Sequence, residues 1–360
     1  MNMRLFSTER SFWKTVLAVL LAGTIFGACG TQSESSVTPV VACEKIQTDP
    51  LLGEPFVIYP IRSEHPATLI RYPFDSSARR SKGIVLYVHG YNDYFFQREL
   101  AKSLDSAGYA FFAIDLHRYG RSLRSSDRAF DADSVGEYFP ELDSAVSMAK
   151  RLAGENLPVA LIGHSTGGLV VSLYADSRNR GKNFFAIVLN SPFLDMNMNA
   201  LVESVAIPAV SFLAKWFPDV KMDESPNPNY GMSLHGSEKG EWDYDLRLKP
   251  LVAPPKTLGW IRAIHLGHLE VQKGLQIETP VFVMHSSCSV DEKIWTEAYA
   301  HCDGVLDVKD IHRYGAGLGK NVTLVEVEGG MHDLYLSRED VRNFALSETL
   351  RFLDSRLGAR

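Results

Sequence analysis

Residues 160–171 read ALIGHSTGGLVV and place Ser165 in a Gly-His-Ser-Thr-Gly pattern. A serine hydroxyl is a weak nucleophile at neutral pH, so acyl transfer needs a base, an acid that orients the base, and donors for an oxyanion. The apolar residues before the pattern predict a buried strand, and those after it predict a helix. The two glycines leave room where a Cβ would clash. Ser165 is therefore the candidate nucleophile, and the alternative is a purely structural turn.

The elements that would position such a serine are short apolar runs with many β-branched or aromatic residues. They are nearly continuous rather than alternating, which is typical of strands buried on both faces of a parallel sheet. These expected strands are residues 83–90, 109–116, 158–165, 184–192, 280–286 and 322–330. Two earlier runs, FVIYPI and ATLIRYPF, are expected to add an antiparallel edge.

Helical spacing of apolar residues occurs between these runs. One such segment ends at Gly108 and another at Gly154, and a third begins after Ser337, the expected N-cap, with Asp340 at the third helical position. Alternating strands and helices predict right-handed βαβ units and a doubly wound α/β sheet.

With the serine turn placed in this framework, the chain from about Lys82 onward resembles the α/β-hydrolase fold. Within that fold it resembles the lysophospholipase, monoacylglycerol lipase and serine aminopeptidase-like group. The segments HGYND, DLHRYGRS and LNSPFLD carry this resemblance, with Arg118 standing where the group usually has a glycine. The resemblance implies a mostly parallel eight-stranded sheet with helices on both faces and an inserted cap.

The resemblance also implies a base. In this fold the chain order is serine, acid, histidine, and His332 follows the last expected strand in EVEGGMHDLYL. His164 is expected to be held in the serine turn and to point elsewhere. The remaining candidates are expected to be packing or surface residues: His265, His268 and His285.

The acid is harder to assign, because the position after the strand PVFVMH where the group usually has it is occupied here by Ser289. Asp303, in DGVLD, matches the group's local pattern best, and Asp291 and Asp307 are the alternatives. On this interpretation residues 287–302 are an insertion before a displaced acid turn. A Cys288–Cys302 disulfide would close the insertion, although free thiols remain an alternative.

The resemblance places the oxyanion donors on main-chain N–H groups of Tyr91 and Thr166. Thr166 stands at the expected start of a helix, where the helix dipole favours negative charge. His89, next to this loop, is expected either to hold the loop or to pack.

Residues 199–278 contain no clear strand and are interpreted as a cap, so the core is residues 51–198 and 279–360. The apolar stretch AIPAVSFLAKWF would suit an acyl chain if it covers the serine, or it packs on the core. The predicted function is cleavage of carboxylic esters, with lysophospholipid or monoacylglycerol as substrate. A serine aminopeptidase is one alternative, for which Glu203, Asp223 and Glu224 could hold an amine.

The N-terminus predicts export. Positive residues precede the uncharged apolar run TVLAVLLAGTIFGA, which is shorter than the ~20 residues that span a bilayer. Gly27 and Ala28 before Cys29 resemble a bacterial lipobox, so residues 1–28 are expected to be a lipoprotein signal peptide and Cys29 the lipidated residue. Gly30 favours the outer membrane, and residues 29–50 are expected to be a polar tether. An ordinary cleaved signal peptide is the alternative.

The overall composition limits other functions. The chain has 360 residues, is 45% hydrophobic and carries a net charge of −6 with both signs interspersed, which disfavours nucleic-acid binding. No metal-ligand spacing or dinucleotide fingerprint is found, so no cofactor and no metal are expected. The partners expected are a small ester or lipid and a membrane, with the oligomeric state open. A non-catalytic surface lipoprotein on a hydrolase scaffold remains an alternative.

Overall fold

The computed structural model describes residues 47–73, 81–198, 202–222 and 227–358. The expected signal peptide and the expected lipidation residue Cys29 lie outside these ranges, as do Asp223, Glu224 and a further cysteine of the sequence, Cys43. Within them, no helix combines the length and apolarity that a membrane crossing requires.

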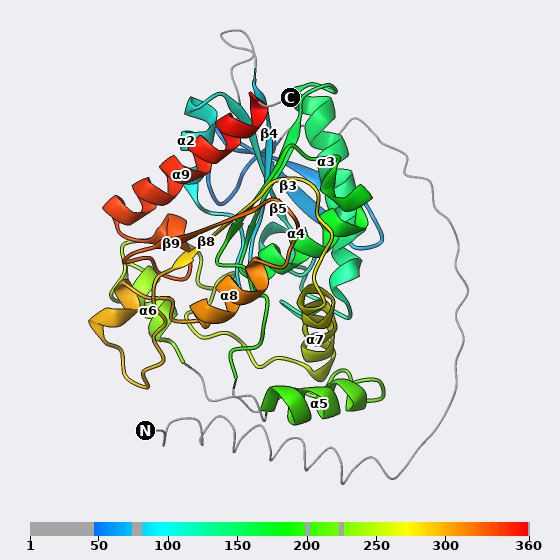
Figure 1. Cartoon of the computed structure of the whole chain (residues 1–360), viewed down its shortest axis with the longest axis vertical. Coiled ribbons are helices and arrows are strands. Elements are labelled where there is room, and N and C mark those ends of the chain that lie inside the picture. The colour runs from blue at the N-terminus through cyan, green and yellow to red at the C-terminus, as the bar shows by residue number, and fades with distance from the viewer. Residues whose placement is uncertain (1–46, 74–80, 199–201, 223–226, 359–360) are drawn as a thin grey trace, which may run out of the picture.

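The centre of the structure is one twisted sheet with the strand order β1-β2-β3-β5-β4-β6-β7-β8-β9 (Figure 1). Strands β1 to β3 form the expected antiparallel edge, and the strands from β5 to β9 are parallel. The strands are Gln47–Thr48 (β1), Val57–Ile61 (β2), Ala67–Arg71 (β3), Gly83–Val88 (β4), Tyr109–Asp115 (β5), Val159–His164 (β6), Ala186–Asn190 (β7), Val281–Ser286 (β8) and Val322–Val327 (β9). The sheet thus has one strand more than the eight expected, and the extra one is the two-residue β1.

Successive residues of a strand point to opposite faces, so a strand apolar at every position feeds two cores. In β4, Ile84, Leu86 and Val88 enter one apolar cluster, whereas Val85 and Tyr87 enter the other. This alternation explains why the central strands read as continuous apolar runs.

Helices cover both faces of the sheet (Figure 1). Helices α2 (Arg98–Ser106) and α9 (Glu339–Leu357) lie on one side, and α3 (Phe139–Ala153) and α4 (Thr166–Ser177) lie on the other. Helix α8 (Val308–Gly315) lies beside β8 and β9. Helix α3 ends at Gly154, whose φ of 143° is one that other residues rarely adopt.

Two expectations about local structure are wrong. The N-cap residue of helix α9 is Arg338 and not Ser337, and its side chain makes no capping hydrogen bond. The Ser337 hydroxyl instead accepts a hydrogen bond from the Met331 N–H at 2.9 Å, because the chain turns back there before the helix begins. The end of the expected tether is also folded: residues 47–48 form β1, and Asp49 is buried in an ion pair with Arg121.

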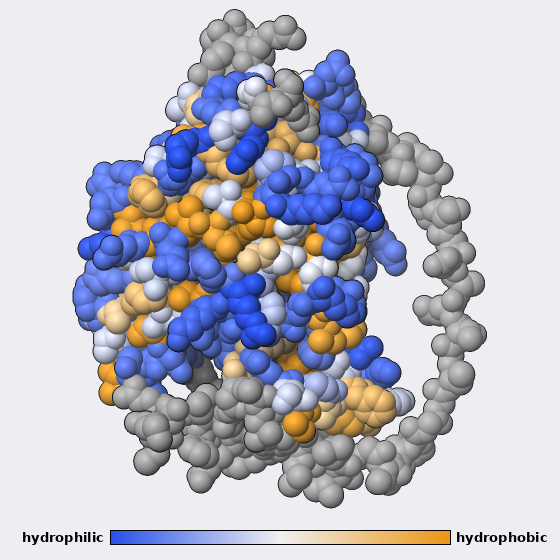
Figure 2. Space-filling view, viewed as in Figure 1, coloured by the Kyte–Doolittle hydropathy of each residue, from blue (hydrophilic) through white to orange (hydrophobic). Residues whose placement is uncertain are grey.

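The segment between β7 and β8 supplies the helices over one end of the sheet. It contains a π-helical turn (Val202–Ala206) and helices α5 (Ile207–Leu213), α6 (Asn229–Leu234) and α7 (Leu258–Gln272). Figure 2 shows apolar residues at the surface over α5. Phe212 and Trp216 are each 56% exposed there, whereas Ile207 and Val210 are buried. The apolar stretch AIPAVSFLAKWF therefore has one buried face and one face exposed to solvent.

Candidate active site

Ser165 sits at the sharp turn between β6 and α4, with φ 53° and ψ −121°. A non-glycine residue in this region is strained, and such strain is held only where the surroundings impose it. The neighbouring glycines show how tight the turn is. A Cβ on Gly163 would lie 2.6 Å from the Gly167 carbonyl oxygen, and one on Gly167 would lie 2.3 Å from the His89 carbonyl oxygen. The turn therefore requires both glycines, and it holds the Ser165 side chain at the end of β6 in a fixed position.

The three residues expected to act together do meet. His332 Nε2 lies 2.9 Å from Ser165 Oγ, and His332 Nδ1 lies 2.8 Å from Asp303 Oδ2. All three side chains are buried. Since Nδ1–H donates to the carboxylate, Nε2 presents a lone pair to the hydroxyl proton. The arrangement can accept a proton from Ser165 and stabilise the imidazolium that forms.

The loop that carries Asp303 explains how an acid so far along the chain reaches this place. Asp303 N–H donates to the Cys288 carbonyl at 2.8 Å, and Asp303 pairs side by side with Ser289 in an isolated bridge. A Cys288–Cys302 disulfide closes the intervening segment, as expected. The second carboxylate oxygen, Oδ1, accepts from the Val305 and Leu306 N–H groups at 2.8 Å each. Asp303 therefore lies beside Ser289, where the resemblance placed the acid, and has a fixed orientation.

The two other acid candidates do not reach His332 by a hydrogen bond. Asp291 is exposed and lines the cavity above the serine. Asp307 is the N-cap of α8, where its side chain accepts from the Lys309 N–H at 2.9 Å. Neither carboxylate is therefore placed to orient His332, and of the three candidates only Asp303 forms a hydrogen bond with the imidazole.

Tyr91 and Thr166, the expected oxyanion donors, both line the same cavity as Ser165. A Cβ on Gly90 would lie 2.9 Å from Ser165 Cβ, so the loop before Tyr91 is in contact with the serine. His89 holds this loop: its Nδ1–H donates to the Gly90 carbonyl at 2.8 Å, and its Nε2 accepts from the Leu116 N–H at 3.1 Å. Of the two expectations for His89, the structure favours the holding role.

His164 does not point away from the site, contrary to expectation. Its Nδ1–H donates to the Asn190 carbonyl at 3.1 Å, and its ring lies against that of His332 with centroids 4.9 Å apart. Burial lowers the pKa of His164, so its ring is neutral beside the candidate base. A second imidazolium there would repel the one that forms on His332.

Sequence reasoning missed the residues behind His332. Asp333 is buried and accepts from Asn190 Nδ2 at 2.7 Å, from Gln97 Nε2 at 3.1 Å and from the Tyr335 N–H at 3.0 Å. The Asn190 side chain also accepts from the Leu334 N–H. These bonds tie the histidine loop to β7 and to the start of α2. No spacing along the chain signals them, because the partners come from three separate segments.

A cavity of about 470 Å³ opens above Ser165, within the range of sites for small ligands. Its walls come from the core and from the segment between β7 and β8, and they are mostly apolar. Ile207, Met222, Leu234 and Trp260 are among the lining residues. From α6, Tyr230 packs edge-on against the His332 ring at 5.5 Å between centroids. The inserted segment therefore covers the candidate site directly.

Two lysines also line this cavity. Lys249 is buried and pairs with Asp93 at 3.0 Å. Burial alone would raise the pKa of Asp93, but neighbouring positive charge, chiefly the Lys249 ammonium, outweighs burial and the pKa is lowered. Lys256 lies over the rings of Tyr91 and Trp260, at 5.5 and 5.8 Å from their centroids. The cavity thus combines apolar walls with a positive charge near its oxyanion side.

The remaining histidines and acids lie away from the serine. His268 is buried and donates to the Phe193 carbonyl at 3.0 Å, and burial lowers its pKa to about 3. His285 is buried and His265 is half-buried. Glu203, one candidate for holding an amine, does not line the cavity. Burial and the neighbouring Asp195 raise the pKa of Glu203 to about 7.

A family model described as "Hydrolase_4: Serine aminopeptidase, S33" matches residues 79–339. The chain belongs to this family. The matched range of this S33-family hydrolase includes Ser165, Asp303 and His332, together with the whole segment between β7 and β8.

Individual relatives confirm the fold. Phospholipase YtpA of Bacillus subtilis is 30% identical over 122 residues, which are 34% of this chain and 44% of that protein, so the match spans less than half of the relative. Monoglyceride lipase of Saccharomyces cerevisiae superposes with a TM-score of 0.62 at 18% identity, covering 88% of this chain and 99% of the lipase. Monoacylglycerol lipase of Paleococcus ferrophilus gives 0.58 at 19% identity, covering 80% and 99%. The predicted α/β-hydrolase fold is confirmed.

Proposed function

We propose that this S33-family hydrolase cleaves carboxylic esters through Ser165, His332 and Asp303. The observation that carries the proposal is the unbroken chain of hydrogen bonds from Ser165 Oγ through both ring nitrogens of His332 to Asp303. The Ser165 end of this series of hydrogen bonds lies at the floor of a covered, mostly apolar cavity. Such a cavity suits the acyl chain of a lipid ester better than a polar substrate.

The reaction follows from the positions of these groups. Ser165 Oγ attacks the ester carbonyl carbon while its proton passes to His332 Nε2. The main-chain N–H groups of Tyr91 and Thr166 receive the negative oxygen, each worth about 3 kcal/mol in the transition state. The imidazolium then protonates the leaving alcohol, and an acyl-enzyme remains. Water, deprotonated by His332, attacks the acyl carbonyl carbon. The bond to Ser165 Oγ then breaks, the carboxylic acid leaves, and His332 returns the proton to Oγ.

We propose a lysophospholipid or a monoacylglycerol as the substrate. The similarity to a phospholipase and to monoglyceride lipases supports both classes. Lys256 offers a way to tell the two substrates apart. Its ammonium group, in the cavity wall, would attract the phosphate of a lysophospholipid, whereas the glycerol of a monoacylglycerol carries no charge to attract. Replacing Lys256 with Gln is therefore expected to raise KM for a lysophospholipid and to leave monoacylglycerol turnover unchanged.

The deciding experiment compares three substrates: a lysophospholipid, a monoacylglycerol and an aminoacyl anilide. Each is assayed with wild type, with Ser165→Ala and with Ser172→Ala, a control in the same helix whose hydroxyl donates to the Gly168 carbonyl. Ester turnover that is lost only in Ser165→Ala supports the proposal. Turnover of the anilide alone would make the protein a peptidase. No turnover by folded protein, with no fluorophosphonate labelling of Ser165, would indicate a non-catalytic scaffold.

We also propose that the chain is an exported bacterial lipoprotein of the outer membrane, held by lipid on Cys29. The support is the sequence around residue 29 alone. Cells grown with an alkyne-tagged fatty acid are expected to label the wild type and Cys43→Ser equally and to leave Cys29→Ser unlabelled. The labelled protein is expected in the outer-membrane fraction of a density gradient. Label retained by Cys29→Ser would contradict the anchor.

A further inference from the structure

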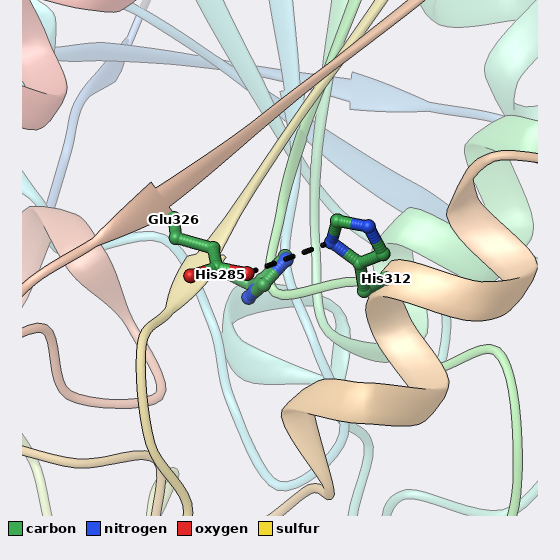
Figure 3. A group of neighbouring side chains, drawn as sticks. All are labelled: His285, His312 and Glu326. Atoms are coloured by element: carbon green, nitrogen blue, oxygen red, sulfur yellow. Dashed lines mark ion pairs between the residues drawn. The ribbon is translucent and has the colours of Figure 1, made fainter.

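Three side chains that the proposed reaction does not use converge at the edge of the sheet (Figure 3). They are His285 at the end of β8, Glu326 on β9 and His312 on α8. His285 and Glu326 are direct partners in the β8–β9 register, so their side chains leave the same face of the sheet. Helix α8 lies over that face and brings His312 to both.

His285 is the unusual member of this group, because it is buried and one of its ring nitrogens has no hydrogen-bond partner among the described residues. Its Nδ1–H donates to the Ser286 carbonyl at 2.7 Å. That bond leaves Nε2 with a lone pair, and within the described ranges no hydrogen-bond donor reaches it although it is buried. A buried polar atom left without a partner is uncommon in folded proteins and calls for an explanation.

The three side chains lie close enough together to share one metal ion. One ligand atom from each of the three residues lies within 4.8 Å of the others, and Glu326 Oε1 is 3.7 Å from His312 Nδ1. Ligand atoms around tetrahedral zinc are about 3.3 Å apart, given Zn–N distances near ~2.0 Å. His312 and Glu326 are exposed, with 54% and 60% of their side chains accessible, so both can shift toward a metal at low cost.

The chemistry of the donors agrees. Two imidazoles and one carboxylate form a ligand set typical of zinc sites. The Ser286 carbonyl fixes the His285 tautomer that presents Nε2, which is the usual role of a residue behind a ligating histidine.

We propose that His285, His312 and Glu326 bind one Zn²⁺ ion, with water as the fourth ligand. The ion would tie α8 to β8 and β9. Helix α8 begins at Val308, directly after the loop of Asp303, so the ion would anchor the far end of a loop whose near end is closed by the disulfide. The site shares no residue with the proposed ester chemistry and does not depend on it.

The test uses the full chain without an affinity tag, stripped of metal by a chelator and titrated with ZnCl₂ in a calorimeter. One equivalent is expected to bind with a micromolar or tighter Kd and to raise the Tm. His312→Ala and Glu326→Gln are each expected to weaken binding at least about tenfold. His301→Ala is the matched control, since His301 also pairs with a glutamate, Glu297 at 3.5 Å, but has no third ligand within the described residues. Its Kd is expected to be unchanged.

A second readout reports the ligand geometry. Co²⁺ in place of Zn²⁺ is expected to give the visible absorption of a four-coordinate site, and His312→Ala is expected to remove it. The proposal is overturned if the wild type shows no binding at about 100-fold molar excess of ZnCl₂. It is also overturned if both variants bind as the wild type does, and zinc binding lost in His332→Ala alone would assign the metal to the triad instead.

Discussion

Replacing Asp303 with Asn tests the proposed acid more sharply than removing the side chain, because the structure dictates how the new amide must orient. Oδ1 of Asp303 accepts from the N–H groups of Val305 and Leu306, and Oδ2 accepts from His332 Nδ1–H. Two donors fixed in the backbone require an oxygen, so in the Asp303→Asn variant the amide oxygen stays with them. The NH₂ group is then forced to face His332.

This orientation reverses the tautomer of the base. The NH₂ group donates to Nδ1, so the proton of the neutral ring moves to Nε2, which then faces Ser165 Oγ without a lone pair. Loss of the correct tautomer in a serine triad lowers kcat by about 10⁴-fold, which corresponds to about 5 kcal/mol of transition-state free energy. Because the size and the backbone contacts of the side chain are retained, stability is expected to change by less than about 1 kcal/mol.

The assay is hydrolysis of a short-chain nitrophenyl ester at about pH 7.5, with urea unfolding measured in parallel. Asp291→Asn and Asp307→Asn are the controls: the first removes the carboxylate that lines the cavity, and the second changes a helix cap. Both are expected to keep kcat within about threefold of wild type, a cap substitution acting mainly on stability. Folded Asp303→Asn protein that keeps a tenth or more of wild-type kcat would refute the assignment.

Three further predictions concern the glycine turn, the disulfide and a buried histidine away from the site. Gly167→Ala places a Cβ 2.3 Å from a backbone oxygen, so it is expected to lower esterase turnover by about 100-fold and stability by about 2 kcal/mol. The control is Gly236→Ala, which is expected to be neutral because the atom nearest to the added Cβ is 3.6 Å away. Replacing both Cys288 and Cys302 with Ser is expected to lower the urea-unfolding free energy by about 3 kcal/mol, since their separation is 14 residues; an unchanged midpoint would contradict this. Burial alone would lower the pKa of His117, but hydrogen bonds to two glutamates raise it to about 9. A raised histidine pKa stabilises the fold below the unfolded value of about 6.5 and ceases to do so as pH rises through about 9. His117→Gln should therefore cost about 2 kcal/mol more at about pH 6 than at about pH 9.5, and a pH-independent cost would refute the linkage.

Local signals in the sequence were enough for the sheet and the serine. The central strands are buried on both faces, so each reads as a continuous apolar run with recognisable ends. The elbow at Ser165 needs glycines at fixed positions for steric reasons, and this too is a local requirement. His332 and the disulfide followed from chain order and from proximity within one loop.

Contacts between distant segments could not be predicted in the same way. The network of Asp333, Asn190 and Gln97 joins three segments, and nothing in the spacing of any one of them indicates it. The ring of His164 turns toward His332 because the Asn190 carbonyl fixes it there, again from another strand. Serine is a common N-cap residue, but the Ser337 hydroxyl accepts a hydrogen bond from the Met331 N–H instead of capping helix α9.

The bridge between Ser289 and Asp303 bears on how such proteins are recognised in genomes. The carboxylate stands next to residue 289 in space but fourteen positions later in the chain. If relatives carry the acid at residue 289, as the resemblance implies, a position-by-position alignment would place a serine in the column of the acid and score the chain as lacking it. Proteins with a comparable disulfide-closed excursion would be discarded by the same filter. Searching for a carboxylate by its distance from the histidine, rather than by its column, would recover them.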